Sequence, residues 1–233
     1  MIEDFSRIES FGWSRHTGAS IVGAIVAEVG VGDRVFVEFG SGATGKECTT
    51  GKLRHDGWTG LWMDGLGDDV LVKKEYVTAE NINALLDKHG MPEYPDVLAI
   101  DIDGVDWWVW RAVSRRPRVV VIEYNASCGP EASVTVPYRP DFKWDRTAYF
   151  GASLEALARL GRRKGYTLVW TCRIGVDAFF VRDDLVPGHF VVRPVARLWR
   201  PQRYGPVQPD GTCAGHPPSN RKMQEVLENG EPA

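Results

Sequence analysis

Short apolar stretches typical of β-strands alternate with helical segments along most of this sequence. The stretches at 34–39, 59–63 and 118–124 are too short for helices and are rich in β-branched and aromatic residues, which indicates buried strands. The seven predicted strands lie at 34–39, 59–63, 74–77, 96–102, 118–124, 166–171 and 177–182. The predicted helices lie at 18–29, 78–88, 105–114 and 153–164. Because strands that alternate with helices pair mostly in parallel, we expect an α/β fold with a mostly parallel, seven-stranded sheet.

The last two predicted strands break this alternation, since only five residues, 172–176, separate them. A connection of this length is too short for a parallel crossover, so the two strands must form an antiparallel hairpin. A parallel sheet that ends in an antiparallel hairpin differs from a plain dinucleotide-binding domain. The sequence therefore predicts a Rossmann-like fold whose sheet ends in an antiparallel hairpin.

Composition and charge limit the classes of protein to which the chain can belong. Its 233 residues are 43% hydrophobic and 25% charged, ordinary values for a globular protein that exclude extensive disorder and a coiled coil. The formal net charge of −3 gives no general attraction for a polyanion, so no nucleic-acid partner is expected. We expect one ligand-binding domain over residues 1–195 and a Pro/Arg-rich extension over residues 196–233. The extension is expected to pack on the surface or on a second subunit, which would make a homo-oligomer.

The first ten residues, MIEDFSRIES, are acidic and lack the apolar core of a signal peptide. No apolar run approaches the ~18 residues that a membrane span needs, so no membrane partner is expected. The four cysteines are far apart in the sequence, which is consistent with free thiols in a reducing compartment. The expected location is the cytoplasm.

A glycine-rich segment, EFGSGATG at 38–45, follows the first predicted strand. Gly40, Gly42 and Gly45 satisfy the pattern G-x-G-x-x-G, in which glycines allow a tight turn and close approach of the backbone to a ligand. Asp64 lies 24 residues beyond Gly40 and ends the second strand, where a carboxylate can bind the ribose hydroxyls of an adenosine ligand. These features fit either NAD or S-adenosylmethionine (SAM).

Three further details favour SAM. A helix precedes the first strand, the sheet is expected to end in a hairpin, and Glu38 stands before the first glycine, where SAM enzymes often hold an acid that orders the loop near the methionine amino group. The predicted cofactor-binding residues are Glu38, Gly40, Ser41, Gly42, Asp64 and Asp101.

Acidic residues gather at the ends of the strands at 96–102 and 118–124. Asp101, Asp103 and Asp106 follow one strand, and Glu123 and Asn125 end the next. Since ligands in open α/β sheets bind beyond the carboxyl ends of the strands, these side chains should lie beside the cofactor and the substrate. Three roles stay open: hydrogen bonding to the methionine part of SAM, removal of a hydroxyl proton, and ligation of a divalent metal.

The candidate catalytic residues are Asp103, Asp106, Glu123 and His16, the last in a segment that could fold over the site. If a metal is present, Asp101, Asp103 and Asn125 are its expected ligands, and their oxygen atoms would suit Mg²⁺. The long connection at 126–150 is expected to act as a lid that shapes substrate choice.

The motifs VEFGSG, GWTGLWMDG, DVLAIDIDG, RVVVIEYN and AFFVR together resemble the FkbM-like SAM-dependent methyltransferases over roughly residues 34–182. The resemblance implies a class I methyltransferase fold, SAM as methyl donor, and often O-methylation of a small metabolite, sugar or natural product. It also implies that Glu38 and Gly40 bind the methionine part, that Asp64 binds the ribose, and that Asp101 lies beside the cofactor. The sequence departs from the family at Asp103, where relatives commonly have the longer Glu, and this departure weakens a base role there.

The leading hypothesis is therefore a SAM-dependent methyltransferase that acts on a small molecule. An NAD(P)-dependent oxidoreductase is the first alternative, supported by the glycine pattern but without a Tyr-x-x-x-Lys catalytic pair. The second alternative is a non-catalytic Rossmann-like module that binds a partner through residues 192–233.

Overall fold

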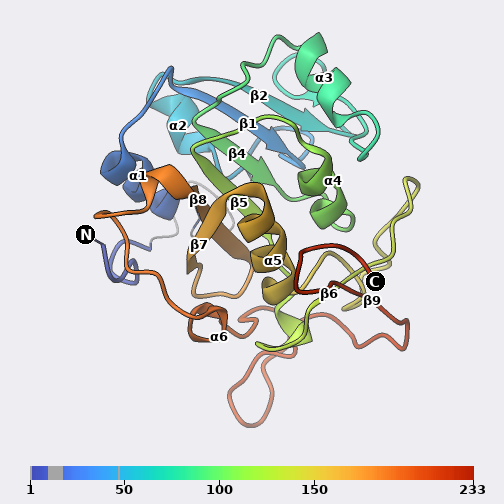
Figure 1. The fold of residues 1–233 in the computed structure, drawn as a ribbon. Coiled ribbons are helices and arrows are strands. Elements are labelled where there is room, and N and C mark those ends of the chain that lie inside the picture. Colours follow the sequence, from blue (N-terminus) through green and yellow to red (C-terminus); the bar gives the residue numbers. More distant parts are fainter. Residues whose placement is uncertain (1, 10–17, 47) are drawn as a thin grey trace.

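The computed structural model describes residues 2–9, 18–46 and 48–233, and it contains the predicted α/β fold. Seven strands form one mixed sheet in the order β3-β2-β1-β4-β5-β8-β7 (Figure 1). These strands are β1 (Val35–Phe39), β2 (Thr59–Asp64), β3 (Lys73–Lys74), β4 (Val97–Ile100), β5 (Val119–Glu123), β7 (Tyr166–Thr171) and β8 (Asp177–Arg182). The first five strands of this order pair in parallel, as the alternation of strands and helices predicts.

The predicted antiparallel hairpin at the edge of the sheet is confirmed. Strand β8 pairs antiparallel with β7 on one side and with β5 on the other. The pairing of β7 with β8 shifts by one position between Leu168 and Trp170, where the strand is irregular. The short connection between the two strands thus reverses the chain direction within the main sheet.

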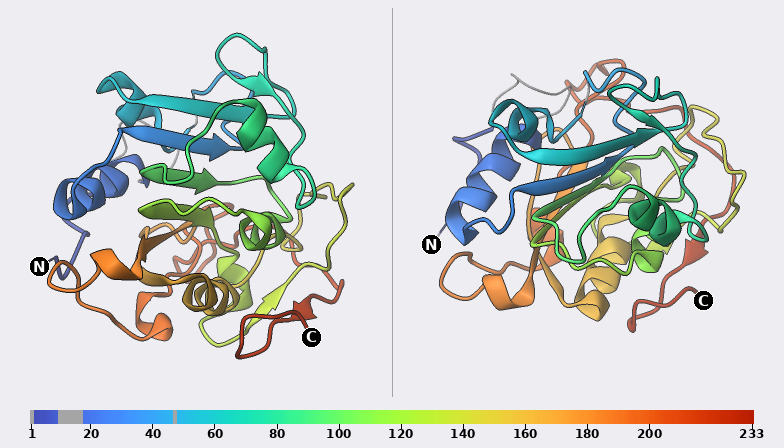
Figure 2. Two further views of the ribbon diagram at one scale, coloured as in Figure 1. Left: turned by 45° about the horizontal axis from the view of Figure 1, so that its top comes forward. Right: turned by 90° about the horizontal axis from the view of Figure 1, so that it is seen from above.

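Helices cover both faces of the sheet, which explains why its central strands are apolar on both sides (Figure 2). The helices are α1 (Gly18–Val29), α2 (Gly51–His55), α3 (Ile82–Lys88), α4 (Asp106–Ala112), α5 (Leu154–Lys164) and α6 (Val195–Leu198). Helices α1 and α2 pack together on one face, while α3, α4 and α5 lie in a row on the other (Figure 1). Within the described parts of the chain, no helix is long and apolar enough to cross a membrane.

The structure differs most from the sequence-based expectation at β3, α3 and α2. Strand β3 covers only two residues at the start of the predicted 74–77 segment, and helix α3 begins four residues later than the predicted 78–88 segment. Thr78 and Asn81 form the turn before α3, since the Thr78 N–H donates to the Asn81 side chain and the Asn81 N–H donates to Thr78 Oγ1. Helix α2 was not predicted, because five residues are too few to show a helical period.

The extension beyond residue 195 folds back onto the rest of the chain. Its strand β9 (Gln224–Glu225) pairs antiparallel with β6 (Val134–Thr135) in the connection at 126–150, and the two lie side by side in Figure 1. Val226 in this extension is fully buried. The extension and the connection therefore form one layer beside the carboxyl ends of the sheet strands.

The backbones of β1 and β4 approach each other closely at Gly40. This residue has φ +75°, and a Cβ atom at this position would lie 1.5 Å from the carbonyl oxygen of Asp101. The Gly40 N–H donates to the Met63 carbonyl at 2.9 Å, and the Asp101 N–H donates to the Phe39 carbonyl at 3.1 Å. Only glycine fits here, because both the left-handed φ and the close approach exclude a side chain.

We predict that Gly40→Ala destabilises the protein far more than Gly57→Ala. Gly57 also has a positive φ, +85°, but nothing lies within 4 Å of a Cβ atom there, so its substitution isolates the cost of the left-handed backbone. That cost is about 1–2 kcal/mol. Urea denaturation should show this loss for Gly57→Ala and a clearly larger one for Gly40→Ala. Equal losses would contradict the close approach described above.

Candidate functional site

A cavity of about 500 Å³ lies at the carboxyl ends of the parallel strands. This position is where open α/β sheets bind their ligands. Its walls come from the glycine turn after β1, the ends of β2, β4 and β5, the connection at 126–150, and the extension beyond residue 195. The volume lies within the range of ~300–1,000 Å³ that is usual for small-molecule sites.

The glycine turn and the end of β2 form one wall of the cavity and are joined by Asp64. One carboxylate oxygen of Asp64 accepts a hydrogen bond from the Gly42 N–H at 3.1 Å, and the other accepts one from the Leu66 N–H at 2.7 Å. Asp64, Gly40 and Gly42 all line the cavity. With Asp101, which also lines the cavity, the structure thus brings together four of the six predicted cofactor-binding residues.

Glu38 and Ser41 lie behind this wall and do not line the cavity. The buried Glu38 carboxylate accepts hydrogen bonds from the Thr49 and Thr50 N–H groups, at 2.7 and 2.9 Å, and from the Thr50 hydroxyl at 2.5 Å. Burial raises the pKa of Glu38, and the bonds from Thr50 oppose this shift. Glu38 therefore orders the segment before α2. The Ser41 hydroxyl is fully buried, and it has no hydrogen-bond partner among the residues that the structure describes.

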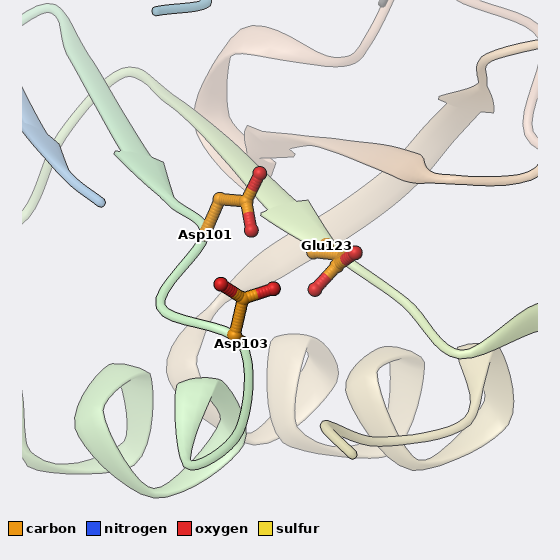
Figure 3. A group of neighbouring side chains, drawn as sticks. All are labelled: Asp101, Asp103 and Glu123. Carbon is orange, nitrogen blue, oxygen red and sulfur yellow. The ribbon is translucent and has the colours of Figure 1, made fainter. Parts of the chain in front are cut away.

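Asp101, Asp103 and Glu123 converge on one side of the cavity and are called the carboxylate cluster below (Figure 3). Each contributes one oxygen atom, and these atoms all lie within 4.8 Å of one another. The register of β4 and β5 pairs Ile100 with Ile122, so Asp101 and Glu123 are the next residues along neighbouring strands. Asp103 reaches the cluster from the following turn, where its φ is +56°.

The three carboxyl groups of the cluster lie close together, and those of Asp101 and Glu123 belong to partly buried residues. Burial raises the pKa of Asp101 well above its ordinary value, and the charges of Asp103 and Asp106 raise it further. Burial also raises the pKa of Glu123, with Asp101 the largest contributor among the neighbouring charges. One oxygen atom of Glu123 is buried without a hydrogen-bond partner among the described residues. Near neutral pH the cluster therefore either retains protons or attracts a cation, such as an ammonium group or Mg²⁺.

Asp106, a predicted catalytic residue, lies outside the cavity wall and shapes the turn that carries Asp103. Its two oxygen atoms accept hydrogen bonds from the Ile102 and Gly104 N–H groups, at 2.8 and 2.9 Å. Burial raises the pKa of Asp106 to about 6, and these two bonds oppose the shift. With both oxygens held by the backbone, Asp106 positions the turn rather than facing a substrate.

Asn125, a predicted metal ligand, also lies apart from the carboxylate cluster. Its amide nitrogen donates to the carbonyls of Ala148 and Phe150, each at 2.9 Å, and its side-chain oxygen accepts from Ser127. These bonds anchor the connection at 126–150, and Glu123 supplies the third oxygen of the cluster instead. His16, another predicted catalytic residue, lies outside the residues that the structure describes.

Sequence reasoning missed the aromatic part of the cavity wall. Phe142 and Trp144 come from the connection at 126–150, and Tyr204 and His216 come from the extension. The rings of His216 and Trp144 lie 4.6 Å apart, and those of His216 and Tyr204 lie 5.0 Å apart, measured between centroids. The length of the 126–150 connection was the one available signal, since neither segment shows a helix or strand period.

The cavity carries negative charge. The acidic residues that line it are Asp64, Glu75, Asp101, Asp103 and Glu123. Within residues 2–9, 18–46 and 48–233, neither lysine nor arginine lines it. The cavity therefore favours ligands that carry positive charge and disfavours phosphates and other polyanions.

We predict that Glu123→Gln stabilises the ligand-free protein at high pH. Because the pKa of Glu123 is raised from 4.5, the folded state binds a proton that the unfolded state releases as the pH rises above 4.5, so stability falls with rising pH. The variant lacks this penalty. Its melting temperature should exceed that of the wild type at pH 8, and the gain should shrink toward pH 4.

Glu131→Gln is the matched control, because it removes the same charge from an exposed position. This control should change the melting temperature little at either pH. A Glu123→Gln variant that is less stable than the wild type at pH 8 would contradict the claim that the ionised Glu123 carboxylate destabilises the folded protein.

The geometry of this cavity is the main guide to its function. No family model matches the chain, and no curated protein matches it. The resemblance to FkbM-like methyltransferases stays a prediction from the sequence motifs. The function is therefore inferred from the place, shape and charge of the cavity.

Proposed function

We propose that this protein is a SAM-dependent methyltransferase that acts on a small molecule, most simply by O-methylation. The observation that carries the proposal is the acidic cavity in which the glycine turn, Asp64 and the carboxylate cluster meet. The class I methyltransferase fold that the sequence motifs imply has a mostly parallel sheet with an antiparallel strand pair at one edge. The strand order and directions described above are compatible with that class.

The residues at the cavity fit SAM on three points. Asp64 faces the cavity at the end of β2, where its carboxylate would accept hydrogen bonds from the ribose hydroxyls. A Cβ atom at Gly42 would meet nothing within 4 Å, so the glycine turn leaves room for a ligand there, and Asp101 would accept from the methionine ammonium group. The Glu123 oxygen that has no hydrogen-bond partner among the described residues adds negative potential beside a positively charged ligand. When bound, SAM supplies an electrophilic methyl group on a positively charged sulfur.

Two observations favour SAM over NAD(P). In a dinucleotide-binding domain, the glycine turn leads directly into a helix whose N-terminus binds the pyrophosphate. Here α2 begins only at Gly51, eleven residues after Gly40, and the described residues between them, 41–46 and 48–50, form no helix. A pyrophosphate would also meet the carboxylates of the cavity with no lysine or arginine from the described residues to neutralise it. The oxidoreductase is therefore the weaker alternative.

A non-catalytic module that uses residues 192–233 to bind a partner is also less favoured. Tyr204 and His216 of this segment line the cavity itself, so the segment helps to form the ligand site. The expected cytoplasmic location and homo-oligomer stay predictions from the sequence. Mg²⁺ at the carboxylate cluster stays a second proposal for the cation that the cluster holds.

We predict that calorimetry will show SAM binding to the wild-type protein and weaker binding to Asp64→Asn. The substitution keeps the shape of the side chain but removes its charge and one of its two acceptor oxygens, a loss of about 1–2 kcal/mol. Glu75→Gln is the matched control, because Glu75 also lines the cavity but pairs with Lys88 and His89. It removes the same charge and should change the affinity less.

Titrations with NAD and with Mg²⁺ alone complete this experiment. Binding of NAD without any response to SAM would refute the methyltransferase. Binding of Mg²⁺ alone would assign a metal to the carboxylate cluster. Equal effects of Asp64→Asn and Glu75→Gln on SAM affinity would refute the ribose contact.

A further inference from the structure

An aromatic wall, formed by Phe142, Trp144, Tyr204 and His216, lines the same cavity as the carboxylates. Trp144 and Tyr204 pack against His216 from two different segments of the chain, and Phe142 lines the same cavity. Trp144 and Phe150 also pack against each other, with 5.9 Å between their ring centroids. These ring contacts hold the imidazole in place. The cofactor residues proposed above do not include these side chains.

The imidazole of His216 is held in a state suited to proton transfer. Burial lowers the pKa of His216 below 6.5, so the ring is neutral at pH 7 and can accept a proton. Its ring nitrogens form no hydrogen bond with any residue in the described parts of the chain. Burial also raises the pKa of Tyr204, which keeps that phenol protonated. Of the two, His216 is the group that can act as a base.

We propose that the aromatic wall binds a flat hydroxy-aromatic acceptor that is neutral or positively charged, and that His216 removes the proton from its hydroxyl group. This inference rests on the methyltransferase proposed above and names its acceptor class and its base. Aromatic rings pack favourably edge-to-face or offset against Trp144 and Tyr204. The carboxylates that line the same cavity disfavour an acceptor that carries a carboxylate or a phosphate.

The proposed step is balanced without any further reactant. The acceptor hydroxyl gives its proton to His216, and the oxygen forms a bond to the methyl carbon of SAM. The bond from this carbon to sulfur breaks, and its electron pair stays on sulfur, which becomes a neutral thioether. His216 then releases its proton to water. The aromatic wall holds the acceptor oxygen in place during this displacement.

His216 shares two cavities with charged and titratable groups from several elements. On the side of the main cavity they are Asp101, Asp103, Glu123, Asp64, Glu75 and Tyr204. On its other side, His216 borders a second cavity that Arg221, Tyr149 and Cys128 also line. Arg221 lies over the ring of Tyr149, 3.8 Å from its centroid. Burial opposes the charged imidazole, which keeps His216 in the neutral form that accepts a proton.

Nuclear magnetic resonance of histidine-labelled protein loaded with S-adenosylhomocysteine tests the acceptor class. The ring signals of His216 are assigned by their loss in His216→Gln. Tyramine, a positively charged phenol, should shift these signals and leave those of His189 unchanged, because His189 pairs with Glu28 away from the cavity. At the same concentration, 4-hydroxybenzoate should shift them much less. No shift with tyramine, or equal shifts with both phenols, overturns the acceptor class.

Methyl transfer from SAM to tyramine, followed by mass spectrometry, tests the base. In His216→Gln, kcat should fall by about 10²–10⁴-fold, the usual contribution of a general base, while the affinity for SAM is unchanged. The fall in kcat caused by His216→Gln should be smaller with 4-nitrophenol as the acceptor, because its hydroxyl is largely ionised at pH 8 and needs no base. The dependence of the tyramine rate on a group with a pKa below 6.5 should also disappear in the variant. His189→Gln is the matched control and should keep full activity.

These outcomes separate the inference from the proposed function. A protein that binds SAM but shows no effect of tyramine on His216 overturns only the acceptor class. Binding of tyramine without methyl transfer overturns the base role, and so does an equal loss with both phenols, because a purely structural defect affects them alike. Failure to bind SAM at all refutes the methyltransferase itself, whatever tyramine does.

Discussion

The contact between the ends of β1 and β4 governs the geometry of the whole site. Gly40 meets the carbonyl of Asp101 at a distance that leaves no space for a side chain. The same contact fixes the glycine turn on one side and starts the turn to Asp103 on the other. Asp64 and Asp106 then hold these two turns through backbone N–H groups. Backbone contacts thus set the positions of the turns around the cavity. Hydrogen bonds from backbone N–H groups hold the turns that carry its charged side chains.

Much of the fold follows from local sequence patterns. The apolar strands at 34–39 and 118–124 and the helix at 153–164 were predicted almost to the residue, because burial on both faces or on one helical face leaves a clear period. The hairpin followed from the length of one connection. Parallel pairing then places the carboxyl ends of β4 and β5 together, which is why the meeting of Asp101 with Glu123 could be expected.

The remaining part of the site depends on contacts that local patterns do not encode. Asn125 lies only two residues from Glu123, but its amide bonds turn it toward the connection at 126–150. His216 lies more than thirty residues beyond the last strand of the main sheet, in a segment with no regular period. Its position depends on the packing of the extension against that connection, for which a single sequence gives no signal. The predictions were therefore strongest on the strands and weakest on the aromatic wall.

A crystal structure with S-adenosylhomocysteine would test the central claim, that the acidic cavity holds SAM, most directly. We expect the ribose hydroxyls within hydrogen-bond distance of the Asp64 carboxylate and the amino group beside Asp101. The sulfur atom should face the space bounded by the carboxylate cluster and His216. A ligand bound outside this cavity, or one whose ribose lies away from Asp64, would contradict the account.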